Sequence, residues 1–168
     1  MIGILYEKNN LSFELVHYLL PKKIANYCEL YKKPFLHFSG LGSTFQTKSN
    51  YLISKKMGEE FIENNNTNYI IVRPSTVYVE EDNFFNLFGK MAKILPFLPL
   101  IKNGMTKFQP IYVNDLTLLI FNLTNNFEKY KNSNLAAVGN EIFTFKEILS
   151  HIFVSLKKKE RFFYIPSF

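Results

Sequence analysis

Two side chains in the middle of the sequence have the types and the spacing that proton transfer requires. Tyr51 and Lys55 are four residues apart, so on a helix they lie one turn apart on the same face. A nearby ammonium group can lower the pKa of a phenol, which lets the tyrosine act as a proton donor or acceptor in carbonyl chemistry. The spacing alone is weak evidence, because this tyrosine and lysine content produces about one such pair by chance. A second pair, Tyr18 and Lys22, is indeed present.

The remaining titratable candidates do not form a metal site in the sequence. His17, His37 and His151 have no cysteine or carboxylate partner at ligand spacing, and Cys28 is the single cysteine. His37 lies in an apolar run, so we predict that it packs in the interior. We predict that Asn114 or Asp115 caps the helix that follows, which makes Asp115 a cap and not a base.

The segment that carries Tyr51 and Lys55 is predicted to be a helix between two strands. Residues 35–38 and 69–72 are short apolar runs, and residues 49–64 between them have helical periodicity. Such a strand–helix–strand unit builds a parallel sheet. The apolar residues of the helix recur at intervals of four and predict one buried stripe: Ile53, Met57 and Phe61.

The rest of the chain continues the alternation of strands and helices. Further strands are predicted at residues 2–6, 108–113, 135–138 and 162–165, and further helices at residues 11–33, 84–94, 114–124 and 144–156. The apolar run 91–101 is flanked by Lys90 and Lys102 and broken by two prolines, which favours a buried lid over contact with a membrane or partner. The pattern predicts an α/β fold with three or four parallel strands and a smaller mixed α/β cap.

Composition excludes several classes of protein. The formal net charge is +6, but eighteen of the twenty basic residues are lysine, whereas readout of nucleic acid bases relies on arginine. We therefore predict a solvated lysine surface and no nucleic acid partner. No apolar run reaches the roughly 18 residues that a membrane span needs, and the first residues do not form a signal peptide. The lone cysteine indicates a reducing compartment.

The order of the motifs resembles that of the extended and atypical short-chain dehydrogenase/reductases, including the NAD-dependent epimerases and dehydratases. The first motifs are Phe35-Leu36-His37-Phe38-Ser39-Gly40, Tyr51 with Lys55, Gly58-Glu59, and Ile71-Val72-Arg73-Pro74. They are followed by Pro96-x-x-Pro99-Leu100, by Gln109-Pro110-Ile111-Tyr112-Val113-Asn114-Asp115, and by Gly139 with Phe143-Thr144. Within this family, Ile2-Gly3-Ile4-Leu5 and His37-Phe38-Ser39-Gly40-Leu41-Gly42 resemble the nucleotide-binding accessory subunits of respiratory complex I and their bacterial relatives.

The resemblance implies an NAD(P)-binding, partial Rossmann-like fold, that is, a doubly wound parallel sheet. Residues 1–80 would be the C-terminal half of the nucleotide-binding domain. Residues 81–168 would be a substrate or cap region interleaved with the last sheet strand, in one compact unit. Tyr51 would be the acid or base, and Lys55 would clamp the cofactor ribose. The hydroxyl partner is assigned to Ser39, with Gly40, Leu41 and Ser43 as alternative positions. The implied cofactor contacts are Gly3, Lys55, Arg73 and Pro74.

Two features depart from the family pattern. None of the seven glycines forms the glycine-rich turn that holds a pyrophosphate at a helix N-terminus, and the resemblance begins near the family's fourth strand. We therefore expect a truncated chain that does not bind NAD(P) usefully by itself. After Pro74, the family's Gly-Pro-Gly is replaced by Val79-Glu80-Glu81-Asp82, and these bulky, acidic residues disfavour close approach to an anionic cofactor.

Three hypotheses follow for the function. The first is an accessory protein of the complex I kind with little or no independent catalysis. It would have as partners either complex I subunits or a separately encoded N-terminal half, and it would lie in the cytoplasm or on the matrix side of the inner mitochondrial membrane. The second is an NAD(P)-dependent reductase, epimerase or dehydratase that acts on a carbonyl or a sugar nucleotide through Tyr51 and Lys55. The third is a non-functional gene fragment.

Overall fold

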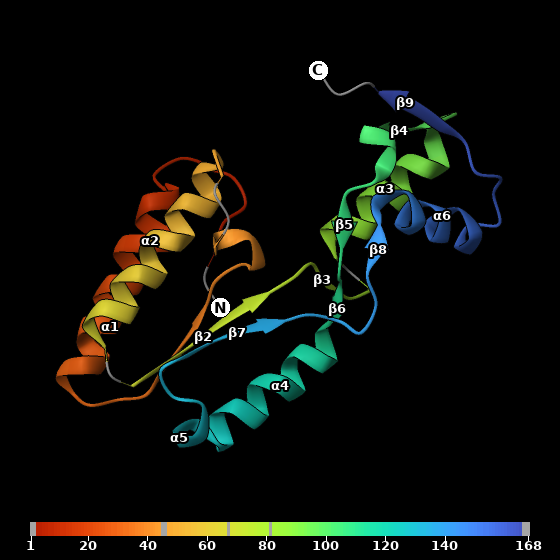
Figure 1. Cartoon of the computed structure of the whole chain (residues 1–168). Helices are drawn as coiled ribbons and strands as arrows, with labels where there is room; N and C mark the ends of the chain where they lie inside the picture. Colours follow the sequence, from red (N-terminus) through yellow and green to blue (C-terminus); the bar gives the residue numbers. More distant parts are fainter. Residues whose placement is uncertain (1–2, 45–46, 67, 81, 166–168) are drawn as a thin grey trace. The chain divides into compact units, whose positions relative to one another are not determined.

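The strand–helix–strand unit around Tyr51 is present and forms part of a three-stranded parallel sheet. The computed structural model describes residues 3–44, 47–66, 68–80 and 82–165. Strands β1 (Phe35–Phe38), β2 (Tyr69–Pro74) and β7 (Ser133–Ala137) lie in the order β1-β2-β7, and both pairs are parallel. Helix α2 (Asn50–Asn65) joins β1 to β2 (Figure 1). The central strand β2 is apolar because its neighbours bury it, and Ile70, Ile71 and Val72 are fully enclosed.

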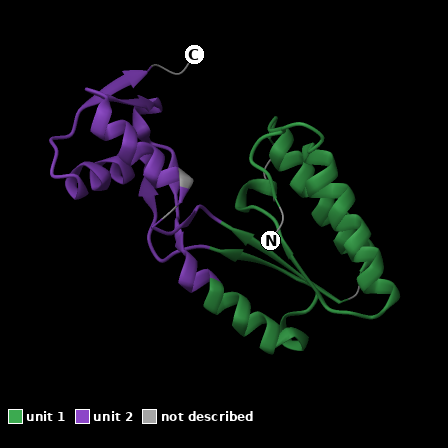
Figure 2. Cartoon of the chain, turned by 180° about the vertical axis from the view of Figure 1, so that it is seen from behind, with its two compact units in different colours: residues 1–74, 117–137 green, residues 75–116, 138–168 purple. Residues whose placement is uncertain are grey.

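The chain divides into two units, each built from two separate stretches of sequence. Unit 1 comprises Met1–Pro74 and Thr117–Ala137, and unit 2 comprises Ser75–Leu116 and Val138–Phe168 (Figure 2). The sequence prediction placed a single boundary after residue 80, whereas the first division in the structure follows Pro74. The stretch that carries β7 belongs to unit 1, so the sheet is completed by residues from the second half of the chain.

The predicted helix 11–33 is present, and a turn of different geometry interrupts it. A π-helical turn, η1 (Leu15–Leu19), leads into α1 (Leu20–Leu30), where Pro21 stands at the start. Proline has no N–H to donate and clashes with the preceding turn of a regular α-helix. The wider π turn before Pro21 therefore keeps the helix continuous. Figure 2 shows α1 and α2 on one face of the sheet and the unit 1 part of α4 (Val113–Asn125) on the other.

The buried face of α2 is not the one that the apolar spacing predicted. Ile53 and Met57 are 42% and 40% exposed, so the predicted stripe is wrong at these two positions, whereas Phe61 packs against the core. The buried residues lie one or two positions further along and are mostly small or polar: Ser54, Lys55, Gly58, Glu59 and Ile62. A Cβ at Gly58 would lie 2.3 Å from the carbonyl oxygen of His17. The close approach of η1 thus requires a small residue on this face, and close packing prevails over hydrophobic periodicity.

Two other predictions for local structure are also corrected. Residues 3–7 form no strand, and Leu5 and Tyr6 are largely exposed; residue 2 lies outside the described residues. The N–H of Ile4 is instead bonded to the ring of His17. Helix α4 begins at Val113, one residue before Asn114, so neither Asn114 nor Asp115 caps it.

The described part of unit 2 contains two long helices, three short strand pairs, a short 3-10 turn (η3, Lys102–Gly104) and the start of α4. The helices are α3 (Asn83–Ile94) and α6 (Phe145–Ser155), and a capping box of Thr144 and Glu147 starts α6. The pairs are β3 (Val77–Tyr78) with β6 (Ile111–Tyr112), β4 (Leu98–Ile101) with β9 (Phe162–Ile165), and β5 (Lys107–Phe108) with β8 (Phe143–Thr144). The core of unit 2 includes Ala92, Leu98, Leu100, Leu149 and Phe153.

The apolar run 91–101 is only partly the buried lid that the sequence predicted. It covers the end of α3 and the strand β4. Leu98 and Leu100 are fully buried, but Ile94, Phe97 and Ile101 are exposed. Among the described residues, no helix is long and apolar enough to cross a membrane.

Candidate functional site

Tyr51 and Lys55 lie on one face of α2 at the carboxyl end of β1, as the resemblance requires. The Lys55 ammonium is 6.0 Å from the centroid of the Tyr51 ring, and it donates a hydrogen bond of 3.4 Å to the carbonyl oxygen of Phe38. The Tyr51 hydroxyl lies beside Gly40, where an added Cβ would be 3.8 Å from the phenol oxygen. Gly40 is therefore the position from which a side chain would meet the tyrosine hydroxyl.

Burial, and not the attraction between the two side chains, sets the pKa shifts of Tyr51 and Lys55. Burial raises the pKa of the Tyr51 phenol above its ordinary value. Burial also lowers the pKa of Lys55, and the nearby Glu59 carboxylate opposes this shift. The pKa of Tyr51 is thus shifted upward and not downward as expected, because burial removes water from around the phenol and disfavours its charged form. Tyr51 stays a protonated phenol at neutral pH.

Ser39, the residue assigned as hydroxyl partner, faces a different group. Its hydroxyl is buried and has no hydrogen-bond partner in good geometry, although it lies close enough to Glu59 to lower the pKa of that carboxyl. Ser43 donates a hydrogen bond of 2.7 Å to the same carboxylate. Both serines therefore lie near Glu59, and the catalytic role of Ser39 stays a prediction.

A buried ion pair near Lys55 was not recognised from the sequence. The Glu59 carboxylate accepts hydrogen bonds of 3.0 Å and 2.6 Å from the Nε and Nη2 atoms of Arg73, and the two side chains are 3% and 17% exposed. Burial alone would raise the pKa of Glu59, but the hydrogen bonds from Arg73 and the nearby serine hydroxyls hold it below its ordinary value. The pair fastens α2 to β2. The sequence offered a signal for this ion pair in the motifs Gly58-Glu59 and Arg73-Pro74, which lie on the helix and on the strand that follows it. We had assigned Arg73 to the cofactor instead.

His17 is a second residue of the site that sequence reasoning missed. Its Nδ1 atom lies 3.0 Å from the hydroxyl of Ser54, whose hydrogen is already donated to the carbonyl of Tyr51. Nδ1 must therefore carry the ring proton, and Nε2 accepts a hydrogen bond from the N–H of Ile4. Burial, with a smaller effect from Lys55, lowers the pKa of His17 to about 4. The neutral ring packs edge-on against the Tyr51 ring, with 5.2 Å between the ring centroids, and holds the tyrosine in place.

His37 is buried in β1, where the sequence predicted a packed histidine. Its Nε2 atom has no hydrogen-bond partner, and burial with the nearby Lys55 lowers the pKa of the ring to about 4. Throughout the described ranges, no group of three histidine, cysteine, aspartate or glutamate residues could hold a metal ion.

The assignment of four residues to the cofactor stays a prediction, and the charged side chains among them have partners within the chain. A Cβ at Gly3 would lie 3.7 Å from the Lys55 ammonium, so the segment around Gly3 covers the lysine, which is 5% exposed. The guanidinium of Arg73 is bonded to Glu59, and Pro74 is paired with Ala137 in the sheet. The charged groups of Lys55 and Arg73 are thus engaged within the chain, which disfavours their contact with a ribose or pyrophosphate.

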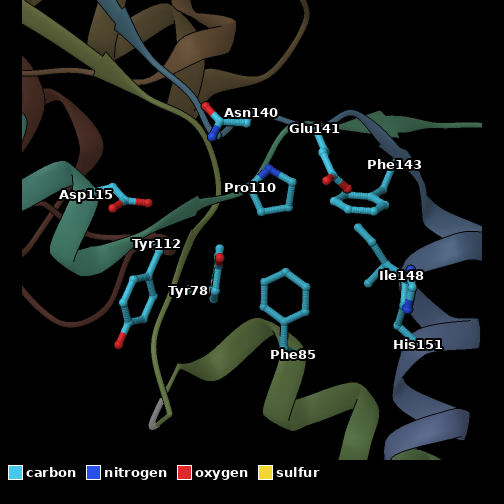
Figure 3. A pocket seen from close by; sticks show the side chains of 11 residues that line it. Tyr78, Phe85, Pro110, Tyr112, Asp115, Asn140, Glu141, Phe143, Ile148 and His151 are labelled. Carbon is cyan, nitrogen blue, oxygen red and sulfur yellow. The ribbon is translucent and has the colours of Figure 1, made fainter.

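Unit 2 contains a cavity of about 500 Å³ with an aromatic wall (Figure 3). The ring of Tyr78 lies 5.3 Å from that of Tyr112 and 5.8 Å from that of Phe85. The charged residues that line the cavity are the acids Asp115 and Glu141, and no lysine or arginine is among the lining residues. A diphosphate would thus meet negative charge here, so the cavity is unsuited to that part of a sugar nucleotide. The aromatic residues were not recognised because they are distant in sequence.

The amino-acid sequence of the chain is similar to those of a group of respiratory subunits. No family model matches the chain. It is 29% identical to the mitochondrial NADH dehydrogenase (ubiquinone) 1 alpha subcomplex subunit 9 of Arabidopsis thaliana, over 99% of this chain and 42% of that protein. It is 34% identical to the subunit of the same name from Mus musculus, over 75% of this chain and 34% of that protein. The predicted resemblance is confirmed.

Solved structures confirm the α/β, Rossmann-like fold. UDP-glucuronic acid 4-epimerase of Bacillus cereus, in complex with NAD, superposes with a TM-score of 0.80 at 15% identity, over 99% of this chain and 61% of that one. dTDP-4-dehydrorhamnose reductase of Bacillus anthracis, in complex with NADP, gives a TM-score of 0.76 at 19% identity, over 92% of this chain and 58% of that one. The chain therefore spans about two-fifths of the first curated relative and about three-fifths of these enzymes.

The purified chain is expected to bind neither NADH nor NADPH at micromolar concentration. One enclosed lysine cannot replace a row of backbone amides at a helix N-terminus. Isothermal titration calorimetry measures this directly, with the Bacillus anthracis reductase and NADPH as the positive control. Stoichiometric binding by this chain would show that its own residues build the site, and would contradict the expectation that they do not bind NAD(P) by themselves.

Proposed function

We propose that the chain is an accessory component of respiratory complex I, with little or no catalysis of its own. The support is that its curated relatives from a plant and a mouse are both named as subunits of NADH dehydrogenase, and that they match 99% and 75% of this chain. Its partners are then other complex I subunits. Both relatives are named as mitochondrial, so the proposed location is the matrix side of the inner mitochondrial membrane.

The proposed lack of catalysis rests on the position of the Tyr51 hydroxyl, which lies beside Gly40. A general acid works best when its pKa lies near the operating pH and when a neighbouring group orients its proton. Gly40 has no side chain to do so, and burial moves the pKa of Tyr51 away from neutrality. The packing of Tyr51 against His17 and Phe13 supports a structural role for this tyrosine.

An enzymatic role remains the second candidate, and the shared face of Tyr51 and Lys55 favours it. The fold neighbours include an epimerase and a reductase solved with NAD and NADP. Such a role requires a phosphate-binding turn, and we propose that a partner segment supplies it. In the described part of the chain, β1 pairs with β2 on one side only. A strand from the proposed partner would add to the other side.

The tagged chain, expressed in its own cells, is expected to be recovered with respiratory complex I subunits after cross-linking. Mass spectrometry of the purified material should identify those subunits above the level found with an equally abundant matrix protein carrying the same tag. Recovery solely in the soluble fraction, without such subunits, would contradict the accessory role. An enzymatic role would instead be indicated by NADH turnover in the recovered complex that Tyr51→Phe abolishes.

A further inference from the structure

The positive charge of the chain is concentrated in two short segments of unit 2. Residues 90–102 and 157–165 together contain seven lysines and arginines and one acid, Glu160, which gives them a net charge of +6. This equals the formal net charge of the whole protein, so the remaining residues are balanced. The two segments adjoin in space, because they contain the paired strands β4 and β9 (Figure 1).

The ribbon formed by β4 and β9 has one face in the core of unit 2 and an outer face that is apolar. Leu98 and Leu100 on β4 are fully buried, and Leu98 is paired with Phe162, which packs against the same core. Side chains alternate along a strand, so the intervening pairs face outward. These outward pairs are Pro99 with Phe163 and Ile101 with Ile165. Phe163 is 64% exposed and Ile101 is 59% exposed.

A basic groove lies at the amino end of the same ribbon. Its cavity of about 210 Å³ has Leu95 and Pro96 in its wall and three cationic residues around it: Lys158, Lys159 and Arg161. The carbonyl of Arg161 accepts a hydrogen bond of 2.9 Å from the N–H of Leu98, so the groove adjoins the start of β4. Lys158 donates hydrogen bonds of 3.1 Å and 2.9 Å to the carbonyl oxygens of Ala92 and Lys93, which fixes it at the end of α3.

Exposed apolar side chains border the groove where α3 ends. Ile94 is 82% exposed and Phe97 is 53% exposed, and both lie within two residues of Leu95 and Pro96 in the groove wall. The surface thus combines large exposed apolar side chains, two of them aromatic, with neighbouring cations. These are the components of a protein surface that rests in the headgroup region of a membrane.

We propose that this surface of unit 2 docks on an anionic phospholipid bilayer. The cations of residues 90–102 and 157–165 would lie at the level of the lipid phosphates, and Ile94, Phe97 and Phe163 would enter the boundary of the acyl chains. Charge complementarity favours a lipid over an acidic protein surface, because large aliphatic and aromatic side chains stand exposed among the cations. The inference is independent of the proposed complex I association, since it concerns the purified chain alone.

The purified chain is expected to float with vesicles of phosphatidylcholine and phosphatidylserine in a density gradient, and to bind pure phosphatidylcholine vesicles weakly. Each lysine or arginine near an anionic surface strengthens binding about fivefold. The double variant Lys159→Glu/Arg161→Glu should therefore bind the anionic vesicles about 30-fold less well or worse. Phe163→Ser should lower binding about tenfold through lost apolar burial.

The matched control is Lys23→Glu/Lys33→Glu, which changes the net charge equally at exposed positions of unit 1. It should reduce vesicle binding by less than about threefold, because these lysines belong to unit 1 and are not part of the proposed docking surface. Circular dichroism of each variant checks folding, and added salt should weaken binding of the unaltered chain. Equal loss in the two double variants, equal binding to both kinds of vesicle, or no binding to the anionic vesicles would each overturn the proposal.

Discussion

Replacing Arg73 by methionine is expected to lower the free energy of unfolding of the protein by about 3–5 kcal/mol. The substitution keeps most of the side-chain volume but leaves the Glu59 carboxylate, which is 3% exposed, without its counter-charge. An unpaired buried charge is far more costly than the loss of an exposed ion pair. Urea unfolding followed by circular dichroism measures the change.

The matched control for this substitution is Lys56→Met on the same helix. Lys56 and Glu60 form an ion pair of 3.6 Å, and both side chains are more than half exposed, so its loss should cost less than about 0.5 kcal/mol. In the unaltered protein the pKa of Glu59 is below its ordinary value. The stabilisation from the ion pair is therefore complete above the unfolded-state pKa and is lost as the pH falls through the folded-state pKa. Arg73→Met and Lys56→Met with equal effects would show that the pair contributes little.

Gly58→Ala is expected to destabilise the protein by about 3 kcal/mol, although alanine is the better helix former. The added methyl group would lie 2.3 Å from the carbonyl oxygen of His17 and 3.5 Å from its carbonyl carbon. The contact is with backbone, so no side-chain rotation relieves it, and η1 and α2 must move apart. A thermal melt should show a corresponding fall in Tm.

Gly89→Ala tests the same substitution where there is room for it. Gly89 lies within α3, and nothing is within 4 Å of the position that its Cβ would take. Alanine there should stabilise the protein by about 0.5–1 kcal/mol through reduced backbone entropy. If Gly58→Ala were also neutral or stabilising, the close approach of η1 to α2 would not be what makes glycine necessary at position 58.

The sheet around Tyr51 could be predicted from the sequence because local signals agree there. Residues 35–38 and 69–72 are short apolar runs, and both form neighbouring parallel strands. The last strand, Phe162–Ile165, was predicted with the same bounds. In these segments strand propensity, length and flanking turn residues all favour the same structure. The predicted first strand failed because a short apolar run has no such support, and Ile4 bonds to His17 instead.

The chemistry of the site could be predicted only in part. The four-residue spacing places Tyr51 and Lys55 on one face, but it carries no information about how far each is buried. Burial sets the direction of their pKa shifts. The partners of Glu59 and His17 come from segments 14 and 37 residues away, so only the folded chain brings them together. The buried face of α2 was misjudged because a scale of hydrophobicity does not recognise a paired lysine or glutamate as core.

The chain passes from one unit to the other three times, after Pro74, after Leu116 and after Ala137. This interleaving has a consequence for synthesis on the ribosome. Strand β2 needs β7 on its second side, and β7 is made only after the first stretch of unit 2 has been synthesised. Closing that contact bridges a long loop, which slows folding. Unit 1 therefore cannot close its sheet until the first stretch of unit 2 has been made, and unit 2 is completed only after unit 1, so folding on the ribosome does not proceed strictly domain by domain.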